Sequence, residues 1–234
     1  MDKIKKFQGN EYTAFGTALH FLCEQLVVDN SKINEGKLIF QSKFLEELTE
    51  IAKTHTLDKK LVNDMRKQGD DLVEYVLPAL KEYFGNYKVI SVEEPLFEKI
   101  THFKTDYKFK GFIDLVLQTG DGKYHVIDWK TCSWGWNAKK RSDKIITYQL
   151  TLYKKFFSLK YNIDVNNVET HFALLKRTAK KQKAEIFRVT SGNRKTDSAL
   201  DLLKKAILNI QSGLTFKNRM SCKYCEFYQT EHCR

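Results

Sequence analysis

The chain has 234 residues, 42% of them hydrophobic and 13% aromatic, which excludes a disordered chain and suffices for one well-packed core. No run approaches the roughly 18 consecutive apolar residues of a membrane-spanning helix, and the first residues lack the apolar segment of a signal peptide, so we expect a cytoplasmic protein with no membrane partner. Lysine and arginine outnumber aspartate and glutamate by 40 to 29, and the net charge of +11 favours a polyanionic partner. No repeat or Pro/Gly-rich linker divides the chain, so we expect one domain over residues 1–234.

The N-terminal third is predicted to be helical. Apolar residues recur at helical spacing over residues 11–28, and His20 lies at the edge of the buried face of that helix. Taken alone, a histidine in such a place is more often a hydrogen-bonded core residue than a metal ligand. Two more helices are expected over residues 36–53 and 57–84, and Pro78 is expected to kink or break the second of them.

A β pattern over residues 87–97 precedes a predicted hairpin over residues 111–130. In the hairpin, two short apolar runs flank a Gly-Asp-Gly connector, which is typical of a tight turn between antiparallel strands. If Gly122 takes the left-handed position of a three-residue loop, Asp114 faces Asp128 across the ladder.

Three ionisable residues lie inside these otherwise apolar strands. Asp128 and Lys130 are two positions apart, so their side chains share one face, and Asp114 would join them there. Two carboxylates at close range need a counter-charge, and a divalent cation such as Mg²⁺ or Mn²⁺ is the usual one. The alternative is an edge hairpin with solvated charges, but charged residues in the apolar middle of a strand are rarely buried without a partner.

Four short motifs follow one another along the chain. They are G-x-x-x-H at Gly16 and His20, G-F-I-D at 111–114, D-W-K-T at 128–131 and Q-x-x-x-Y at Gln149 and Tyr153. The last two residues lie four apart on a helix predicted over residues 143–158, and therefore on one face of it. In type and order these motifs resemble the PD-(D/E)xK nuclease superfamily in its RecB-like branch, which includes the AddB subunit and CRISPR-associated adaptation nucleases.

The resemblance implies an α/β fold with a restriction-endonuclease-like core. That core has the order α, β, β, β, α, β around a mixed central sheet, and here additional N-terminal helices would extend it. The rest of the chain fits this order, because strands are expected near residues 171–176 and 185–189 and a helix near residues 196–211.

The resemblance also implies the roles of the site residues. The implied catalytic residues are Asp114, Asp128 and Lys130, and the implied ligands of one or two Mg²⁺ or Mn²⁺ ions are His20, Asp114, Asp128 and the backbone carbonyl of Trp129. Lys130 would position or deprotonate the attacking water, or stabilise the phosphorane. RecB-like nucleases often carry a glutamate at the end of the preceding strand, and Glu94 is the candidate, although the adjacent glutamate at 93 leaves the register open.

Candidate DNA contacts follow the hairpin. The resemblance implies that Gln149 and Tyr153 help to bind DNA, and two tryptophans beside a basic run could stack on splayed bases. These further candidates are Trp134, Trp136, Lys139, Lys140 and Arg141. Closure of the two indoles over the core is an equal alternative, and the basic run could face water alone.

Three cysteines near the C-terminus, Cys222, Cys225 and Cys233, have the spacing C-x2-C-x7-C. Such spacing places thiolates within reach of one metal, so a zinc site with His232 or Cys23 as fourth ligand is one alternative and free thiols are another. The resemblance favours a 4Fe-4S cluster held by these three cysteines and one N-terminal cysteine. That first cysteine normally precedes the G-x-x-x-H helix, yet residues 1–19 contain none. Either Cys23 replaces it or an upstream segment supplies it, and we expect the second.

The sequence therefore predicts a metal-dependent DNA nuclease, an exonuclease that acts on DNA ends in replication, recombination or repair. A structure-specific or nicking endonuclease is the alternative within the class. An inactive nucleic-acid-binding subunit of a larger complex is the alternative outside it. The small size and lysine-rich composition suit a phage or mobile-element protein.

Overall fold

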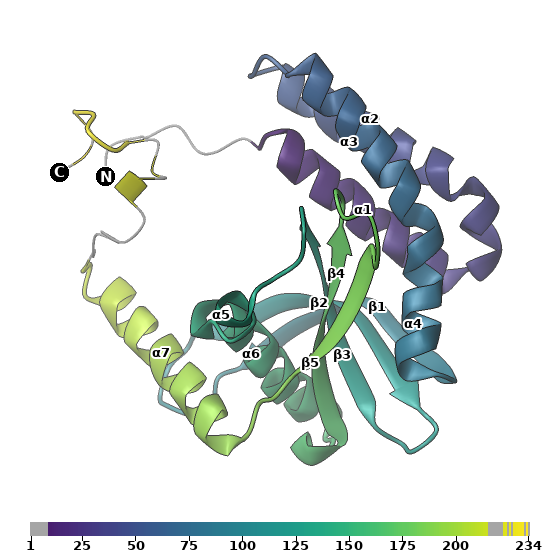
Figure 1. The fold of residues 1–234 in the computed structure, drawn as a ribbon. Coiled ribbons are helices and arrows are strands. Elements are labelled where there is room, and N and C mark those ends of the chain that lie inside the picture. Colours follow the sequence, from purple (N-terminus) through teal and green to yellow (C-terminus); the bar gives the residue numbers. More distant parts are fainter. Residues whose placement is uncertain (1–8, 215–221, 224, 226, 232, 234) are drawn as a thin grey trace.

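The structure is a computed structural model that describes residues 9–214, 222–223, 225, 227–231 and 233. Its centre is a five-stranded sheet with the strand order β1-β2-β3-β4-β5 (Figure 1). The strands are β1 (Tyr87–Lys99), β2 (Lys108–Thr119), β3 (Tyr124–Cys132), β4 (Val168–Lys176) and β5 (Ala184–Val189). β3 pairs with β4 in parallel, and the other neighbours are antiparallel, so the sheet is mixed.

Helices cover both faces of the sheet (Figure 1). On one face lie α1 (Glu11–Val28), α2 (Gly36–Ala52), α3 (Lys59–Leu72) and α4 (Val76–Phe84), with the 3-10 helices η1 (Asn30–Glu35) and η2 (Val73–Tyr75) between them. After β3 the chain forms α5 (Ala138–Arg141), α6 (Lys144–Tyr161) and η3 (Val165–Asn167), and it forms α7 (Asn193–Gln211) after β5. No helix in the described part of the chain is long and apolar enough to cross a membrane. The predicted α/β fold with a mixed sheet and additional N-terminal helices is confirmed.

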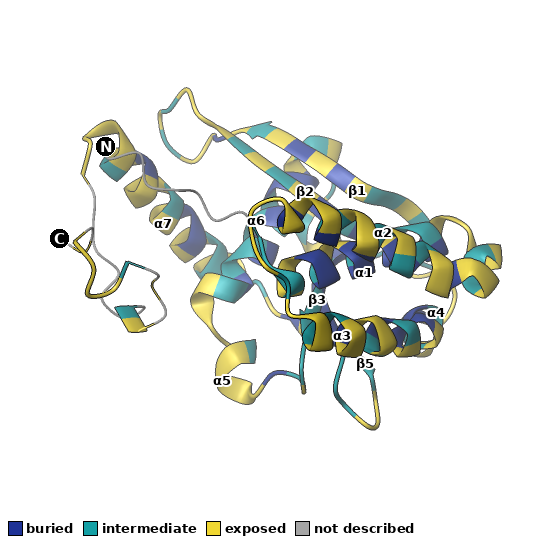
Figure 2. Ribbon diagram, turned by 90° about the horizontal axis from the view of Figure 1, so that it is seen from above, coloured by how far each residue is buried: buried dark blue, intermediate teal, exposed yellow. Residues whose placement is uncertain are grey.

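Two apolar cores hold the layers together. The first lies between α1 to α4 and one face of the sheet, and α1 is its most buried helix, whereas α2 and α3 present exposed outer faces (Figure 2). The second lies between the opposite face of the sheet and α6 and α7. Each face of the sheet is therefore packed, so a charged side chain on β2 or β3 is removed from water unless it lies where the packing opens.

The start of α1 follows from its sequence. Asn10 caps the helix by accepting from the Thr13 peptide N–H at 3.1 Å, and the Thr13 hydroxyl oxygen accepts from the Asn10 peptide N–H at 2.8 Å. This reciprocal capping box satisfies backbone donors that the first helical turn leaves free. The predicted helix over residues 11–28 is confirmed at both ends.

The helical segment predicted over residues 57–84 is divided into α3 and α4, which confirms the expected break. Pro78 is the physical cause, although the break precedes it. A proline ring clashes with the carbonyl four residues earlier, here that of Glu74, which lies in the intervening turn η2. Pro78 is instead the third residue of α4, where a missing N–H removes no intrahelical hydrogen bond.

The hairpin between β2 and β3 has the predicted turn. Gly122 has a φ of +82°, and its N–H donates to the carbonyl of Thr119 at 2.9 Å. The register places Gln118 opposite Tyr124, in agreement with a three-residue loop. β3 then leads through α5 and α6 to β4, the helical crossover that a parallel strand pair requires.

Candidate active site

The β2–β3 hairpin opens beyond Leu115, which pairs with Ile127 at the end of the regular ladder. There the peptide N–H of Trp129 donates to Asp114 Oδ2 at 2.7 Å, so a side-chain carboxylate takes the place of a backbone acceptor. Asp114 lies where the strands separate, near enough for its charge to raise the pKa of Asp128, whereas the sequence placed the two acids opposite each other in a regular ladder.

Asp128 and Lys130 follow one another on the same face of β3. The carboxylate of Asp128 is only 1% exposed and is ion-paired with Lys130 Nζ. The lysine side chain is partly exposed, so it reaches from the buried acid toward the surface. The pair matches the D-x-K arrangement that the sequence predicted.

His20 reaches the same place from α1. Its Nδ1 lies 3.4 Å from Asp114 Oδ2, and a hydrogen bond joins the ring to the backbone of Trp129. Burial lowers the pKa of His20 below its ordinary value, although the charge of Asp128 opposes this effect. The imidazole is therefore neutral at neutral pH and keeps a nitrogen lone pair for a metal. One turn earlier, Gly16 lies against Thr131, where a Cβ would be 3.7 Å from its Oγ1.

The surroundings of Asp114 and Asp128 disfavour the charged forms of both carboxylates. Burial raises the pKa of Asp114 to about 6, and burial together with the charge of Asp114 raises the pKa of Asp128 to about 6. Lys130 lowers both pKa values but does not cancel the rise. Two carboxylates, a neutral imidazole and the neighbouring Trp129 backbone form a donor set that fits a divalent cation, because a bound cation supplies the positive charge that this site lacks.

The predicted position of the strand glutamate requires a correction. Val92 pairs with Leu115 and Glu94 with Ile113, so Glu93, not Glu94, lies level with Asp114. Glu93 also lines a cleft of about 390 Å³ together with His20. Burial and nearby negative charges raise the pKa of Glu93, and its φ of +49° is unusual for a residue with a side chain.

Glu94 contacts the end of α6 instead of the cleft beside His20. Its carboxylate accepts hydrogen bonds from Lys160 Nζ and from the Tyr161 hydroxyl, both at 2.5 Å, and thereby ties β1 to the end of α6. Although burial opposes the effect, these bonds lower the pKa of Glu94. The side chains of adjacent residues in a strand point to opposite faces of the sheet. The register with β2, which the sequence left open, therefore decides which of the two glutamates lies level with Asp114.

Gln149 and Tyr153 lie together on α6, where the Gln149 amide donates to the Tyr153 hydroxyl at 3.2 Å. The Tyr153 ring covers Gly111, where a Cβ would lie only 2.8 Å from Cε1 of that ring. Burial raises the pKa of Tyr153, and the charges of Asp114 and Asp128 raise it further. The structure thus brings the Q-x-x-x-Y motif next to the G-x-I-D and D-x-K motifs.

The other DNA-contact candidates separate into two groups. Trp134 is 72% exposed, and Lys139 and Lys140 are exposed as well. Trp136 is 7% exposed and packs against Phe172, so the alternative of closure over the core holds for this indole, and its assignment as a DNA contact is wrong.

Arg141 belongs with Trp136 rather than with the exposed candidates. Its guanidinium donates to Glu185 Oε1 at 2.6 Å and to the Trp136 carbonyl at 2.8 Å, and it therefore holds the loop in place.

The described residues do not assemble the predicted cysteine site. Within the described residues, Cys222, Cys225 and Cys233 form no group of three or more close metal-ligating atoms. Cys23 is fully buried in the first core, and burial raises the pKa of its thiol well above the ordinary value, which disfavours the thiolate form that binds metals. His232, the other candidate fourth ligand, lies outside the described residues.

A family model described as the PD-(D/E)XK nuclease superfamily matches residues 2–230. None of the curated proteins matches. A solved structure from Eubacterium rectale, described as a "Putative exonuclease", has a TM-score of 0.50 and 13% identity, with 91% of this chain and 74% of that chain covered. The structure of SSO0001 has a TM-score of 0.42 and 20% identity, with 90% of this chain and 81% of that chain covered.

Proposed function

Because the chain belongs to the PD-(D/E)XK nuclease superfamily, we propose that it is a DNA nuclease that hydrolyses phosphodiester bonds with Mg²⁺ or Mn²⁺. The observation that carries this proposal is the convergence of His20, Asp114, Asp128 and Lys130 where the β2–β3 hairpin opens. The raised pKa values of the two acids support metal binding, since a cation relieves the repulsion between them.

The proposed ligands are the side chains of His20, Asp114 and Asp128 and the carbonyl of Trp129, and Glu93 lines the adjacent cleft. When bound, the metal polarises the scissile phosphate and lowers the pKa of an attacking water. Asp128 holds the ammonium of Lys130 beside the ligands, where the lysine can orient that water or stabilise negative charge on the phosphorane. The neutral imidazole of His20 would offer a nitrogen lone pair to the metal without adding charge to the site.

DNA would approach over the part of the molecule that carries Gln149, Tyr153 and the loop after β3. Gln149 orients the Tyr153 hydroxyl, and the ring of Tyr153 rests on Gly111 beside the acids. Trp134 offers an exposed face on which an unpaired base can stack, and Lys139 and Lys140 offer charge to phosphates.

We propose exonuclease action on DNA ends as the mode of cleavage, in replication, recombination or repair. The Eubacterium rectale structure, which shares this fold, is described as a "Putative exonuclease", and that description supports this mode of cleavage. A structure-specific or nicking endonuclease is the alternative. Circular single-stranded DNA separates the two, because an exonuclease leaves it intact and an endonuclease linearises it.

The experiment that tests the proposal uses end-labelled single- and double-stranded DNA with Mg²⁺ or Mn²⁺. We expect Asp128→Ala and Lys130→Ala to abolish cleavage while the circular dichroism spectrum stays native. Asp106→Ala, which removes an exposed carboxylate from the β1–β2 loop, is the matched control and should cleave normally. Normal cleavage by both Asp128→Ala and Lys130→Ala would contradict the assignment.

The spacing of Cys222, Cys225 and Cys233 supports a separate metal centre, for which we propose a 4Fe-4S cluster, with zinc as the alternative. Iron and zinc contents are measured after anaerobic purification, together with visible absorbance. A brown protein whose iron disappears in Cys225→Ser supports the cluster. A colourless protein whose zinc content falls in the same variant supports zinc, and unchanged metal content indicates free thiols.

A further inference from the structure

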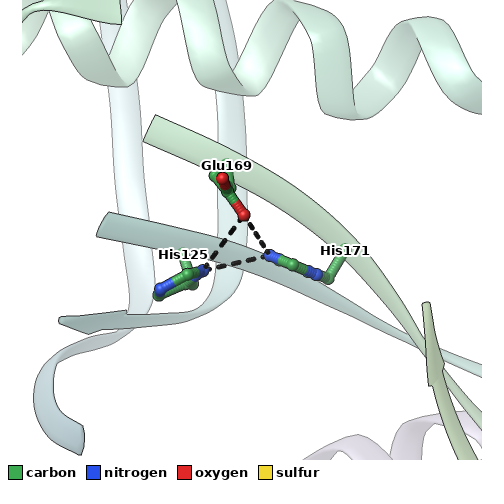
Figure 3. Close-up of side chains that lie close together, drawn as sticks. All are labelled: His125, Glu169 and His171. Carbon is green, nitrogen blue, oxygen red and sulfur yellow. Dashed lines mark hydrogen bonds and ion pairs between the residues drawn. The ribbon is translucent and has the colours of Figure 1, made fainter. Parts of the chain in front are cut away.

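A second group of metal-ligating side chains lies on the opposite face of the sheet from Asp128. His125 on β3 and Glu169 and His171 on β4 point toward one another (Figure 3). His125 precedes Asp128 by three positions, and an odd offset in a strand reverses the side-chain direction. The two imidazoles accordingly pack against Phe84 at the end of α4, with ring centroids 4.9 and 5.1 Å away.

The three ligand atoms have the separations that one small cation needs. His125 Nδ1 lies 3.1 Å from His171 Nε2, and Glu169 Oε2 lies 4.0 Å from each nitrogen. By plane geometry, a single point lies about 2.2 Å from all three atoms, close to the roughly 2.0–2.2 Å at which zinc binds nitrogen and carboxylate oxygen.

Neighbouring groups hold His125 in the tautomer that binds metal. Its Nε2 lies 2.9 Å from the Thr119 hydroxyl, which donates its own proton to Asp121 Oδ1 at 2.5 Å. Thr119 must therefore accept from His125 Nε2–H, and the Nδ1 lone pair is left facing the centre of the cluster. A metal-binding histidine usually donates its other ring N–H to a fixed acceptor, and the Thr119 hydroxyl would be that acceptor for His125.

Glu169 and His171 are directed at the same point. Lys123 Nζ and Arg188 Nη2 contact Glu169 Oε1 at 3.3 and 3.2 Å, and the other oxygen, Oε2, faces the histidines. The His171 side chain is 2% exposed, and its Nδ1 has no hydrogen-bond partner within the described residues. Because His125 Nδ1 is unprotonated, the 3.1 Å contact is a hydrogen bond that His171 Nε2–H donates, and a metal ion would replace this bond once that proton has moved to Nδ1. Burial lowers the pKa of both rings, that of His171 to about 3, so both are neutral at neutral pH.

We propose that His125 Nδ1, His171 Nε2 and Glu169 Oε2 form a zinc site separate from the proposed magnesium site. Two imidazoles and one carboxylate favour zinc over magnesium, which prefers oxygen ligands. The cluster lies in a cleft of about 530 Å³ that leaves the fourth position to water. The ion would join β3 to β4 beneath the end of α4 and thereby stabilise the sheet.

The test measures zinc binding by competition with a chromophoric chelator, in excess Mg²⁺ so that the catalytic acids are occupied. The protein is the full chain with Cys222, Cys225 and Cys233 replaced by Ser, which removes the other candidate zinc ligands. We expect one zinc per chain, at least about 100-fold weaker binding in His125→Gln and in Glu169→Gln, and about 10- to 100-fold weaker binding in Thr119→Val. His102→Gln, at an exposed histidine that pairs with Asp201, is the matched control and should bind zinc normally.

Zinc should also raise the melting temperature of the cysteine-free chain but not that of His125→Gln. The absence of bound zinc, or equal affinity in His125→Gln, Glu169→Gln and the parent, would overturn the proposal. If the cysteine-free chain fails to fold, the unaltered chain is loaded with Co²⁺. A visible spectrum of a four-coordinate ion without thiolate charge transfer then supports the site, and thiolate charge transfer alone contradicts it.

Discussion

At the residue scale, Glu93 and Glu94 are neighbours with opposite surroundings, and their variants should differ accordingly. Glu93→Gln removes a carboxylate from the cleft beside His20, so we expect kcat/KM to fall by about 10- to 100-fold with a native melting temperature. Glu94→Gln weakens the contacts to Lys160 and Tyr161, so we expect a loss of about 1–3 kcal/mol in unfolding free energy and normal cleavage. Steady-state kinetics and urea unfolding measure the two effects. The reverse pattern would show that the register at Glu93 is misassigned.

The two buried acids predict how the effect of Mg²⁺ depends on pH. In the metal-free folded state their pKa values are about 6, above the ordinary value of 3.8, so the folded chain binds protons more tightly than the unfolded chain. Stability without metal should therefore fall as pH rises from about 4 through about 6. Mg²⁺ competes with those protons, so it should raise the melting temperature strongly at pH 7.5 and little at pH 5. In Asp128→Asn the rise in melting temperature caused by Mg²⁺ should differ much less between pH 7.5 and pH 5. An equal rise at both pH values in the parent protein would contradict this prediction.

The residue-level predictions from the sequence were right where spacing alone decides geometry. Asp128 and Lys130 share a face because they are two apart on one strand, and Gln149 and Tyr153 meet because they are four apart on one helix. The cluster of His125, Glu169 and His171 was missed because it depends on the parallel register of β3 and β4, whose strands are separated by a helical crossover. Local spacing carries no information about such a register.

At the scale of elements, the contact between α2 and α3 depends on Gly69. A Cβ at this position would lie 2.0 Å from the buried ring of Phe40, which leaves no room for a methyl group. We expect Gly69→Ala to lower the unfolding free energy by about 1–3 kcal/mol through overpacking, despite the roughly 1 kcal/mol gain in helix propensity. Lys67→Ala, an exposed position of the same helix, is the control and should change stability by less than about 0.5 kcal/mol. A Gly69→Ala variant as stable as the parent would contradict this packing.

The loop after β3 gives a second prediction at this scale. Trp134 is exposed, so Trp134→Ala should weaken the binding of single-stranded DNA by roughly 1–3 kcal/mol without a change in stability. Trp136→Ala should instead destabilise the fold by about 3–5 kcal/mol, because that indole is packed against Phe172. Fluorescence anisotropy with labelled DNA and thermal unfolding distinguish the two. Unchanged DNA affinity in Trp134→Ala would remove it from the DNA-binding surface.

Prediction of the elements from sequence succeeded for α1 and was incomplete for residues 57–84. The apolar stripe of α1 runs the whole length of the helix, so both ends were recovered. In the longer segment Pro78 indicated a kink or a break, but the apolar stripe continues through η2 and gives no sign of where the break falls. Its position is set by the clash of the proline ring with the carbonyl four residues earlier.

At the scale of the whole molecule, the net charge of +11 predicts strongly salt-dependent DNA binding. The plot of log K against log salt should have a steep negative slope, measured with the cleavage-deficient Asp128→Ala variant. Replacement of Lys139 and Lys140 by Gln should make the slope shallower by about 1.4 to 1.8 if both contact phosphates. Lys204 and Lys205 on α7 provide the control pair, and an equal change in slope for both pairs would show that the charge acts without a localised surface.

The fold class was predictable because the order of helical and strand patterns limits the topologies that a chain can adopt. The parallel pairing of β3 with β4 agrees with the helical pattern between them. The metal centre at the C-terminal cysteines stays a prediction, since only the spacing of these cysteines indicates that they could bind one metal.

The opening of the hairpin at Asp114 has a consequence for the order of folding. Asp114 and Asp128 are 14 residues apart and their hairpin closes locally, whereas His20 precedes Asp114 by 94 residues. Contacts between distant residues form at a greater entropic cost than local ones, so the docking of α1 should follow hairpin formation. The capacity to bind the catalytic metal would then arise only as the chain completes its fold, and a partly folded nuclease would be unable to cut.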